Sequence, residues 1–116
     1  SLYVQKAAVK ALGSYTDSGP PECVRKNVAT YQERRNVLVK ALKSFGLQCE
    51  IPKATFYVWA NCGTDSMEFS KKALEKGVMV TPGIGFGKYG EGFIRFALTI
   101  PVERIREACE RIASIM

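Results

Sequence analysis

The stretch VMVTPGIGFGKYGEGFIRFAL, residues 78–98, carries the strongest structural signal in the chain. Residues 78–81 (VMVT) and 92–99 (GFIRFALT) are rich in β-branched and aromatic side chains, which is typical of β-strands. The glycines between them permit positive φ and close approach of two backbone segments. The stretch therefore predicts two strands joined by a tight corner, or by a loop that lines a cleft.

The same glycines spell G-x-G-x-x-G from Gly85 to Gly90, the spacing of a dinucleotide-binding loop. Such a loop must lead into a helix, because the helix N-terminus supplies the amides and the dipole that hold the phosphates. Here the strand-like residues 92–99 follow instead, and the chain contains no Gly-Lys-Ser or Gly-Lys-Thr. The sequence therefore disfavours a nucleotide site at this loop.

Outward from this stretch, helices and strands are predicted by apolar spacing and by helix-ending glycines. The predicted helices cover residues 2–12, 22–45, 66–76 and 101–116, and the further strands cover 47–51 and 55–61. Asp65 and Glu68 resemble a capping box at the start of the third helix. This order predicts an α+β fold with a small mixed β-sheet, helices packed mainly on one face, and a long preceding helix.

Composition indicates one small globular domain of 116 residues, with 47% hydrophobic residues and a formal net charge of +6. No apolar run is long enough to span a membrane, and no signal-peptide pattern is seen. Since the first residue is Ser1, we expect a piece of a longer protein. The basic residues between positions 25 and 43 indicate either a phosphate-binding face or, as we favour, the solvated side of a helix.

The cysteines and the absence of histidine limit the chemistry. Four cysteines occur without a C-x-x-C pair, and no histidine is present. We therefore predict no metal site and no catalytic triad. Thiols without a disulfide pattern are typical of a reducing compartment, so we expect a cytoplasmic protein.

An RNA-recognition module is an alternative interpretation of the same glycine-rich stretch. Gly90, Gly92, Phe93 and Phe96 fit the RNP1 octet of that fold, and residues 56–60 (FYVWA) stand where a second RNA-binding strand would lie. The octet fails elsewhere, because a glutamate, which repels phosphate, replaces a stacking aromatic residue. Binding of single-stranded RNA is therefore kept as the alternative function, although a nucleic-acid partner is disfavoured.

Three segments together resemble the C-terminal region of class I/II pyridoxal-phosphate aminotransferases. They are YQERRNVLVKALKSFG, KATFYVWAN and VMVTPGIGFGKYGEGFIRFAL, followed by RIREACERI. Within these segments, KATFYVW and GEGFIR are most similar to the LL-diaminopimelate, aspartate and alanine-type branches of the family. The resemblance covers residues 22–116 and implies a linker helix and loop at the end of a large domain (1–20), a long connecting helix (21–46) and a small domain (47–116).

The resemblance implies amino transfer between an amino acid and a 2-oxo acid, in a homodimeric parent protein. Arg95 matches the family arginine that binds the substrate α-carboxylate, a task for which a bidentate guanidinium is well suited. The loop around Gly83, Gly85, Phe86 and Gly87 is expected to border the mouth of the active site.

The resemblance also implies what must come from elsewhere in the parent. The family binds pyridoxal 5'-phosphate through a lysine in a serine-rich motif, and no Ser-x-Ser-x-Lys occurs here. Lys71 and Lys72 follow a serine but have no counterpart in the family. We therefore expect no catalytic residue in this chain, cofactor binding by a missing large domain, and no activity of the chain alone.

Overall fold

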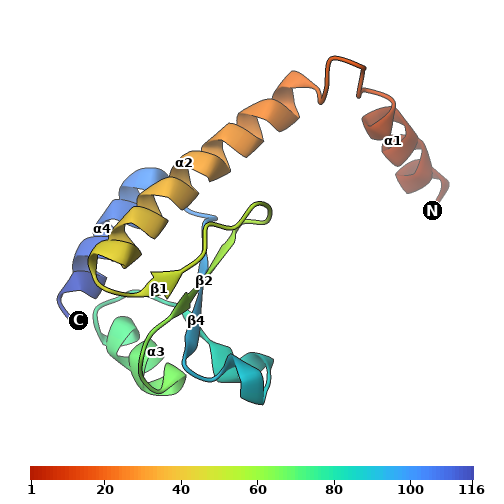
Figure 1. Cartoon of the computed structure of the whole chain (residues 1–116). Coiled ribbons are helices and arrows are strands. Elements are labelled where there is room, and N and C mark those ends of the chain that lie inside the picture. Colours follow the sequence, from red (N-terminus) through yellow and green to blue (C-terminus); the bar gives the residue numbers. More distant parts are fainter. The chain divides into compact units, whose positions relative to one another are not determined.

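The computed structural model describes all residues from 1 to 116, and its elements follow in the predicted order (Figure 1). The chain divides into two compact units, Ser1–Thr30 and Tyr31–Met116, so the boundary lies within the long helix α2 (Glu22–Ser44). The three-part division predicted from the sequence, 1–20, 21–46 and 47–116, stays a prediction.

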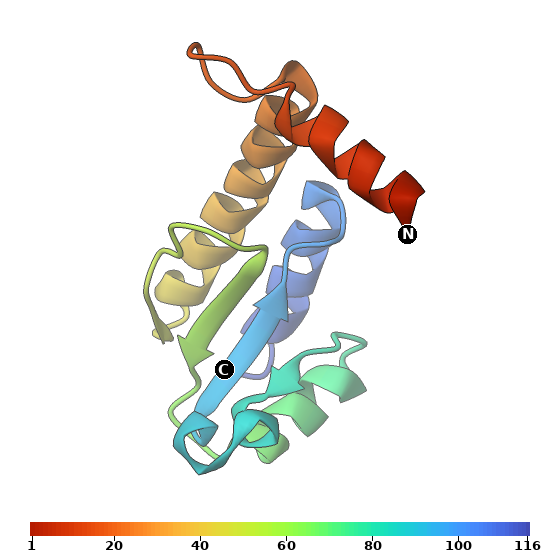
Figure 2. The same ribbon diagram turned by 90° about the vertical axis from the view of Figure 1, so that its right-hand side faces the viewer.

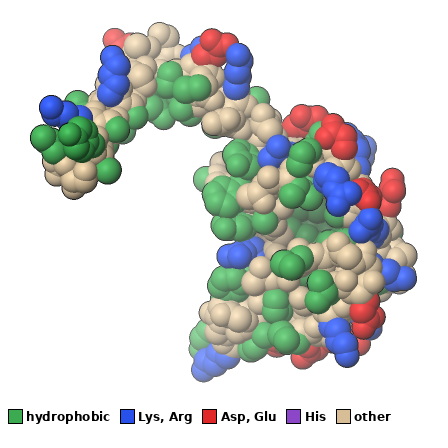
Figure 3. All heavy atoms as spheres, turned by 180° about the vertical axis from the view of Figure 1, so that it is seen from behind, with side chains coloured by type: hydrophobic (Ala, Val, Ile, Leu, Met, Phe, Trp, Pro, Cys, Tyr) green, Lys and Arg blue, Asp and Glu red, His purple; other side chains and the backbone are tan.

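The first unit contains α1 (Leu2–Leu12), a turn and the first part of α2. No residue of α1 is buried, although Leu2, Val9 and Leu12 are apolar. Figure 3 shows apolar side chains gathered on this helix. The first unit therefore has no hydrophobic core of its own.

The second unit is built on a four-stranded sheet in the order β1-β2-β4-β3. The strands are β1 (Gln48–Cys49), β2 (Tyr57–Asn61), β3 (Thr81–Pro82) and β4 (Phe93–Ala97). Every neighbouring pair is antiparallel, so the predicted mixture of strand directions is wrong, while the α+β class is confirmed. The glycine-rich segment reverses the chain between β3 and β4, which makes these two strands antiparallel neighbours.

One face of the sheet is covered by helices, as predicted. Val58 and Ala60 of β2 and Ile94 and Phe96 of β4 are buried on this face. Figure 2 views the sheet from its open side, with α2 and α4 (Val102–Ala113) behind β2 and β4. The core combines these strand residues with side chains from three helices: Leu38, Val39, Leu42, Phe69, Ala73, Ile105, Cys109 and Ile112.

The helix ends follow local chemistry. The Asp65 side chain accepts a hydrogen bond from the Glu68 N–H at 2.9 Å, which caps α3 (Ser66–Glu75). Gly46 and Gly77 follow α2 and α3 with φ of +86° and +74°, where a side chain would be strained. Pro101 precedes α4 as its N-cap and is not its first helical residue.

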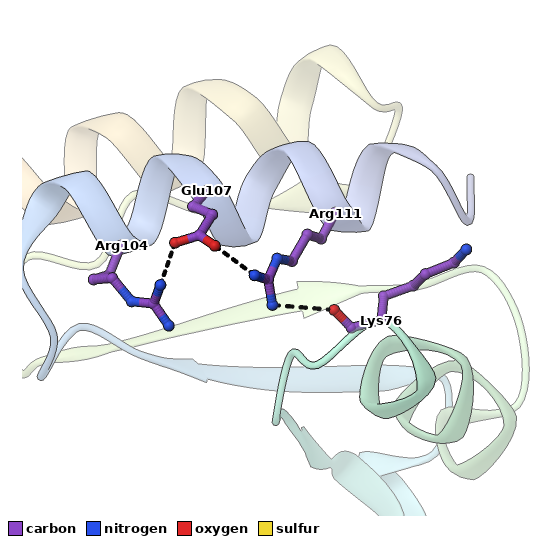
Figure 4. A network of polar contacts seen from close by, with 4 residues as sticks. All are labelled: Lys76, Arg104, Glu107 and Arg111. Carbon is purple, nitrogen blue, oxygen red and sulfur yellow. Dashed lines mark hydrogen bonds and ion pairs between the residues drawn. The ribbon is translucent and has the colours of Figure 1, made fainter.

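A polar network connects α4 to the end of α3 (Figure 4). Glu107 forms ion pairs with Arg104 and Arg111, one turn away on either side. Arg111 also donates a hydrogen bond to the Lys76 carbonyl at 3.4 Å. Because these side chains remain partly exposed, each ion pair contributes only about 0.3–0.5 kcal/mol, and the network mainly sets how the two helices meet.

Candidate functional site

Arg95 lies on the open face of the sheet, opposite the face that the helices cover. Strand alternation dictates this, because its neighbours Ile94 and Phe96 point into the core. The guanidinium carbon lies 4.2 Å from the centre of the Tyr57 ring and 4.7 Å from that of the Phe86 ring. Two aromatic rings on different segments therefore hold a half-buried cation by cation–π contact.

The hydrogen bonding of Arg95 is incomplete within the chain. Its Nη2 donates to Thr81 Oγ1 at 3.4 Å, and its buried Nε has no partner. None of the ion pairs in the structure includes Arg95. Since buried donors are nearly always paired, this guanidinium is a candidate for binding an anionic ligand.

A cleft of about 980 Å³ opens beside Arg95 on this face. Trp59 lies in its wall, stacked on Phe93 with ring centres 5.7 Å apart and in edge contact with Phe86 at 5.5 Å. The other wall comes from the β1 edge and the loop after it. The lining residues there include Gln48, Cys49, Glu50, Ile51, Pro52 and Lys53.

Cys49 is the thiol in this cleft. Burial raises the pKa of Cys49, and the nearby Lys43 only partly opposes this effect. A raised pKa keeps the thiol protonated and therefore a weak nucleophile near neutral pH. Cys49 therefore has no feature of an activated cysteine.

The glycine-rich loop folds into two short 3₁₀ turns, Gly83–Phe86 and Lys88–Gly90. The backbones of Gly83 and Gly90 are in contact, so that a Cβ at Gly83 would lie only 1.9 Å from the Gly90 carbonyl oxygen. Gly87 has a φ of +112°, whereas Gly85 has open space around it. Phe86, one of the four predicted loop residues, contacts Arg95, and the role of the loop at an active-site mouth stays a prediction.

The loop is followed directly by β4, as predicted, and not by a helix. Of the residues that fit the RNP1 octet, Phe96 is buried against the helices, whereas Phe93 lies on the open face and stacks on Trp59. The basic face of α2 is also partly used within the fold. Arg34 donates to the Leu98 carbonyl and Arg35 to the Pro52 carbonyl, each at 3.0 Å.

Tyr57 is a site residue that was not predicted from the sequence. The register of β2 against β4 pairs Trp59 with Arg95, which makes Tyr57 a diagonal neighbour of Arg95 on the same face. This contact could have been inferred once the register was known, but the sequence does not fix the register. No group of three or more acidic, cysteine or histidine side chains that could hold a metal ion occurs in the structure.

The family model for class I and II aminotransferases matches residues 1–112. The chain belongs to this aminotransferase family. A curated relative, the LL-diaminopimelate aminotransferase of Moorella thermoacetica, is 47% identical over a match that covers 97% of this chain and 28% of the relative. The chain thus spans little more than a quarter of the length of that relative.

Solved aminotransferase structures share the fold as well. An aromatic aminotransferase from Pyrococcus horikoshii superposes with a TM-score of 0.82 at 34% identity, over 97% of this chain and 31% of its own. A probable N-succinyldiaminopimelate aminotransferase from Thermus thermophilus gives a TM-score of 0.77 at 40% identity, over 84% of this chain and 27% of its own. The α+β architecture of this chain is therefore that of part of an aminotransferase. No helix in it is both long and apolar enough to cross a membrane.

Proposed function

We propose that this chain is the small-domain part of a pyridoxal-phosphate-dependent aminotransferase and that Arg95 binds the α-carboxylate of the substrate. The observation that carries the proposal is the state of Arg95. Its guanidinium is half-buried between Tyr57 and Phe86, faces a cleft, and has no carboxylate partner in the chain. A substrate carboxylate would supply the missing acceptor.

The geometry suits orientation of a substrate. A guanidinium can donate two parallel hydrogen bonds to one carboxylate, which fixes the direction of the bound group as well as its position. The two flanking rings restrict the plane in which the guanidinium can lie. Because the site is partly shielded from water, the ionic attraction is stronger than at an exposed surface. Arg95 thereby sets the orientation of the α-carbon relative to the reacting groups.

Pyridoxal 5'-phosphate, when bound, supplies the electron-withdrawing chemistry of amino transfer. This chain lacks the serine-rich lysine motif of the family, so we assign none of its residues to the cofactor. We propose that the cofactor, the catalytic lysine and the homodimer contacts belong to the rest of the parent protein, and that the isolated chain is inactive. The amino donor to test first is LL-diaminopimelate, the substrate in the name of the relative from Moorella thermoacetica. The four cysteines are unpaired, which supports the proposed cytoplasmic location.

The test uses the full-length parent protein with Arg95→Lys. We expect amino transfer from LL-diaminopimelate, aspartate or alanine to 2-oxoglutarate to lose about 100-fold in kcat/KM, because lysine keeps the charge but not the bidentate geometry. The visible absorbance of the bound cofactor should be unchanged. Arg106→Lys is the matched control, because Arg106 is exposed and forms no ion pair. An Arg95→Lys enzyme with wild-type kcat/KM for every donor would refute the assignment.

A further inference from the structure

We propose that Ser66 and Glu91 form a positioning pair that holds Phe86 over Arg95; this inference rests on the function proposed above. Ser66 is the first residue of α3 and is completely buried. Its backbone N–H donates to Glu91 Oε1 at 2.8 Å, and its hydroxyl donates to Glu91 Oε2 at 3.0 Å. One carboxylate is thus held by two donors of a single residue 25 positions away in sequence.

Ser66 also binds the other end of the glycine-rich loop. Its Oγ accepts a hydrogen bond from the Ile84 N–H at 3.3 Å, while Glu91 lies just after the second 3₁₀ turn. The two ends of the loop therefore meet at one buried hydroxyl. The backbone contact between Gly83 and Gly90 closes the loop on itself at the same place.

The N-terminus of α3 explains why a carboxylate stands at position 91. The first N–H groups of a helix have no partner within the helix, and its dipole favours negative charge there. Asp65 accepts from the Glu68 N–H, and Glu91 accepts from the Ser66 N–H. The two acids therefore serve different donors of one helix end, and Glu91, unlike Asp65, joins that end to the loop together with the Ser66–Ile84 hydrogen bond.

Phe86 is the link between this pair and Arg95. It ends the first 3₁₀ turn, two residues after Ile84, and its ring lies 4.7 Å from the Arg95 guanidinium carbon. If the loop is released from Ser66, Phe86 is held only by its edge contact with Trp59 and can move away from Arg95, which then keeps the Tyr57 ring on one side. Glu91 and Ser66 are then positioning residues, which act on Arg95 through Phe86 without touching the substrate.

The first experiment uses the 116-residue chain and needs no activity. In ¹⁵N-labelled chain, the Arg95 Nε–H resonance reports the ring currents of Phe86 and Tyr57, and Phe86→Leu defines the shift caused by loss of one ring. Glu91→Ala and Ser66→Ala should move this resonance in the same direction as Phe86→Leu, and Glu91→Gln should move it less because one acceptor oxygen is kept. Asp65→Ala is the matched control, because it removes the other cap of the same helix and should leave the resonance in place.

The second experiment uses the full-length parent protein. Glu91→Ala should lower kcat/KM for the amino donor about 10- to 100-fold, the scale of a small misplacement of a binding group, while the cofactor absorbance is retained. Glu91→Gln should recover part of this loss, and Asp65→Ala should match the parent.

The outcomes separate the two proposals. If Asp65→Ala shifts the Arg95 resonance as much as Glu91→Ala does, the effect is general destabilisation and the positioning pair is refuted. An unmoved resonance in both Glu91 variants refutes it as well, even if Ser66→Ala fails to fold. If Arg95→Lys impairs the enzyme but Glu91→Ala does not, only the positioning pair fails. If Arg95→Lys has no effect, the proposed function itself fails.

Discussion

Replacing Gly83 with alanine should destabilise the protein by about 3 kcal/mol, the upper end of the cost of forcing a methyl group into filled space. A Cβ at position 83 would lie 1.9 Å from the Gly90 carbonyl oxygen and 2.7 Å from the Phe93 carbonyl oxygen. Both obstacles are backbone atoms, so no side chain can swing away to make room. Relief requires separating the two ends of the loop, which also breaks the contact that closes it.

Gly85 provides a control in the same loop. A Cβ there would meet nothing within 4 Å, and the residue does not have a positive φ. Gly85→Ala should therefore be neutral or stabilising by up to about 1 kcal/mol, because alanine lowers the entropy of the unfolded chain. Gly87→Ala should fall between the two variants, with a cost of about 1–2 kcal/mol, because its φ of +112° is strained for a side chain.

Urea unfolding measures these differences, with Trp59 as the only tryptophan in the chain and circular dichroism as a second probe. With a slope of about 1–3 kcal/mol per molar urea, a loss of about 3 kcal/mol lowers the midpoint by about 1–3 M. The unsubstituted protein, Gly85→Ala and Gly83→Ala should share one slope. A free energy of unfolding for Gly83→Ala within about 0.5 kcal/mol of that of the unsubstituted protein, the usual range of harmless surface changes, would refute the packing argument.

Two further predictions concern α3 and the cysteines. Asp65→Ala should lose about 1 kcal/mol in urea unfolding because it removes the N-cap. Lys72→Ala removes only an exposed ion pair to Glu68 and should lose clearly less, so equal losses would contradict the capping role. Iodoacetamide should modify the exposed Cys23 well before Cys109, whose pKa is raised chiefly by burial, as peptide mass spectrometry would show. Equal reactivity of the two thiols would contradict the buried placement of Cys109. Because folding raises the pKa of Cys109, the stability that the protonated thiol contributes is lost as the pH rises through the folded-state pKa. Cys109→Ala should therefore weaken the decline of stability with rising pH.

Local signals in the sequence predicted the helices and their ends well. Gly46 and Gly77 end helices with positive φ, and Asp65 caps the start of one. These signals were predictable because each residue acts on backbone only a few positions away. Alternation along β4 predicted two sides, and the structure separates Arg95 from the buried Ile94 accordingly. These features depend on backbone geometry that neighbouring residues determine.

Features that depend on distant contacts were not predictable in the same way. The strand directions depend on how the chain returns between strands, so the mixed sheet was a wrong prediction. A strand was predicted at residues 78–81, but β3 covers only Thr81–Pro82. Val78 and Val80 are buried in the core and do not pair with β4. Arg34 belongs to the basic stretch that was favoured as the solvated side of a helix, and it donates a hydrogen bond to the Leu98 carbonyl 64 positions away.

The three glycines of the G-x-G-x-x-G spacing lie in different environments. Gly90 must lack a side chain because a Cβ there would lie 2.1 Å from the Gly83 carbonyl oxygen, and Gly87 needs its positive φ. Gly85, the first glycine of the pattern, has neither constraint. In a dinucleotide-binding loop each of the three glycines has a role, in the tight turn, in the approach to the pyrophosphate or in helix–strand packing, whereas here Gly85 has no constraint. The pattern is therefore a coincidence of spacing.

Glu91 looked like a defect in the RNA-binding pattern considered for the loop, because its carboxylate repels phosphate and stands where a stacking ring is expected. Its two bonds to Ser66 give it a use that this pattern does not contain. A residue that contradicts a motif is therefore informative when its partner is found. Here the partner is Ser66, which also bonds the loop that carries Phe86. Phe86 in turn contacts Arg95, which is half-buried on the open face, lies between two rings and forms no ion pair.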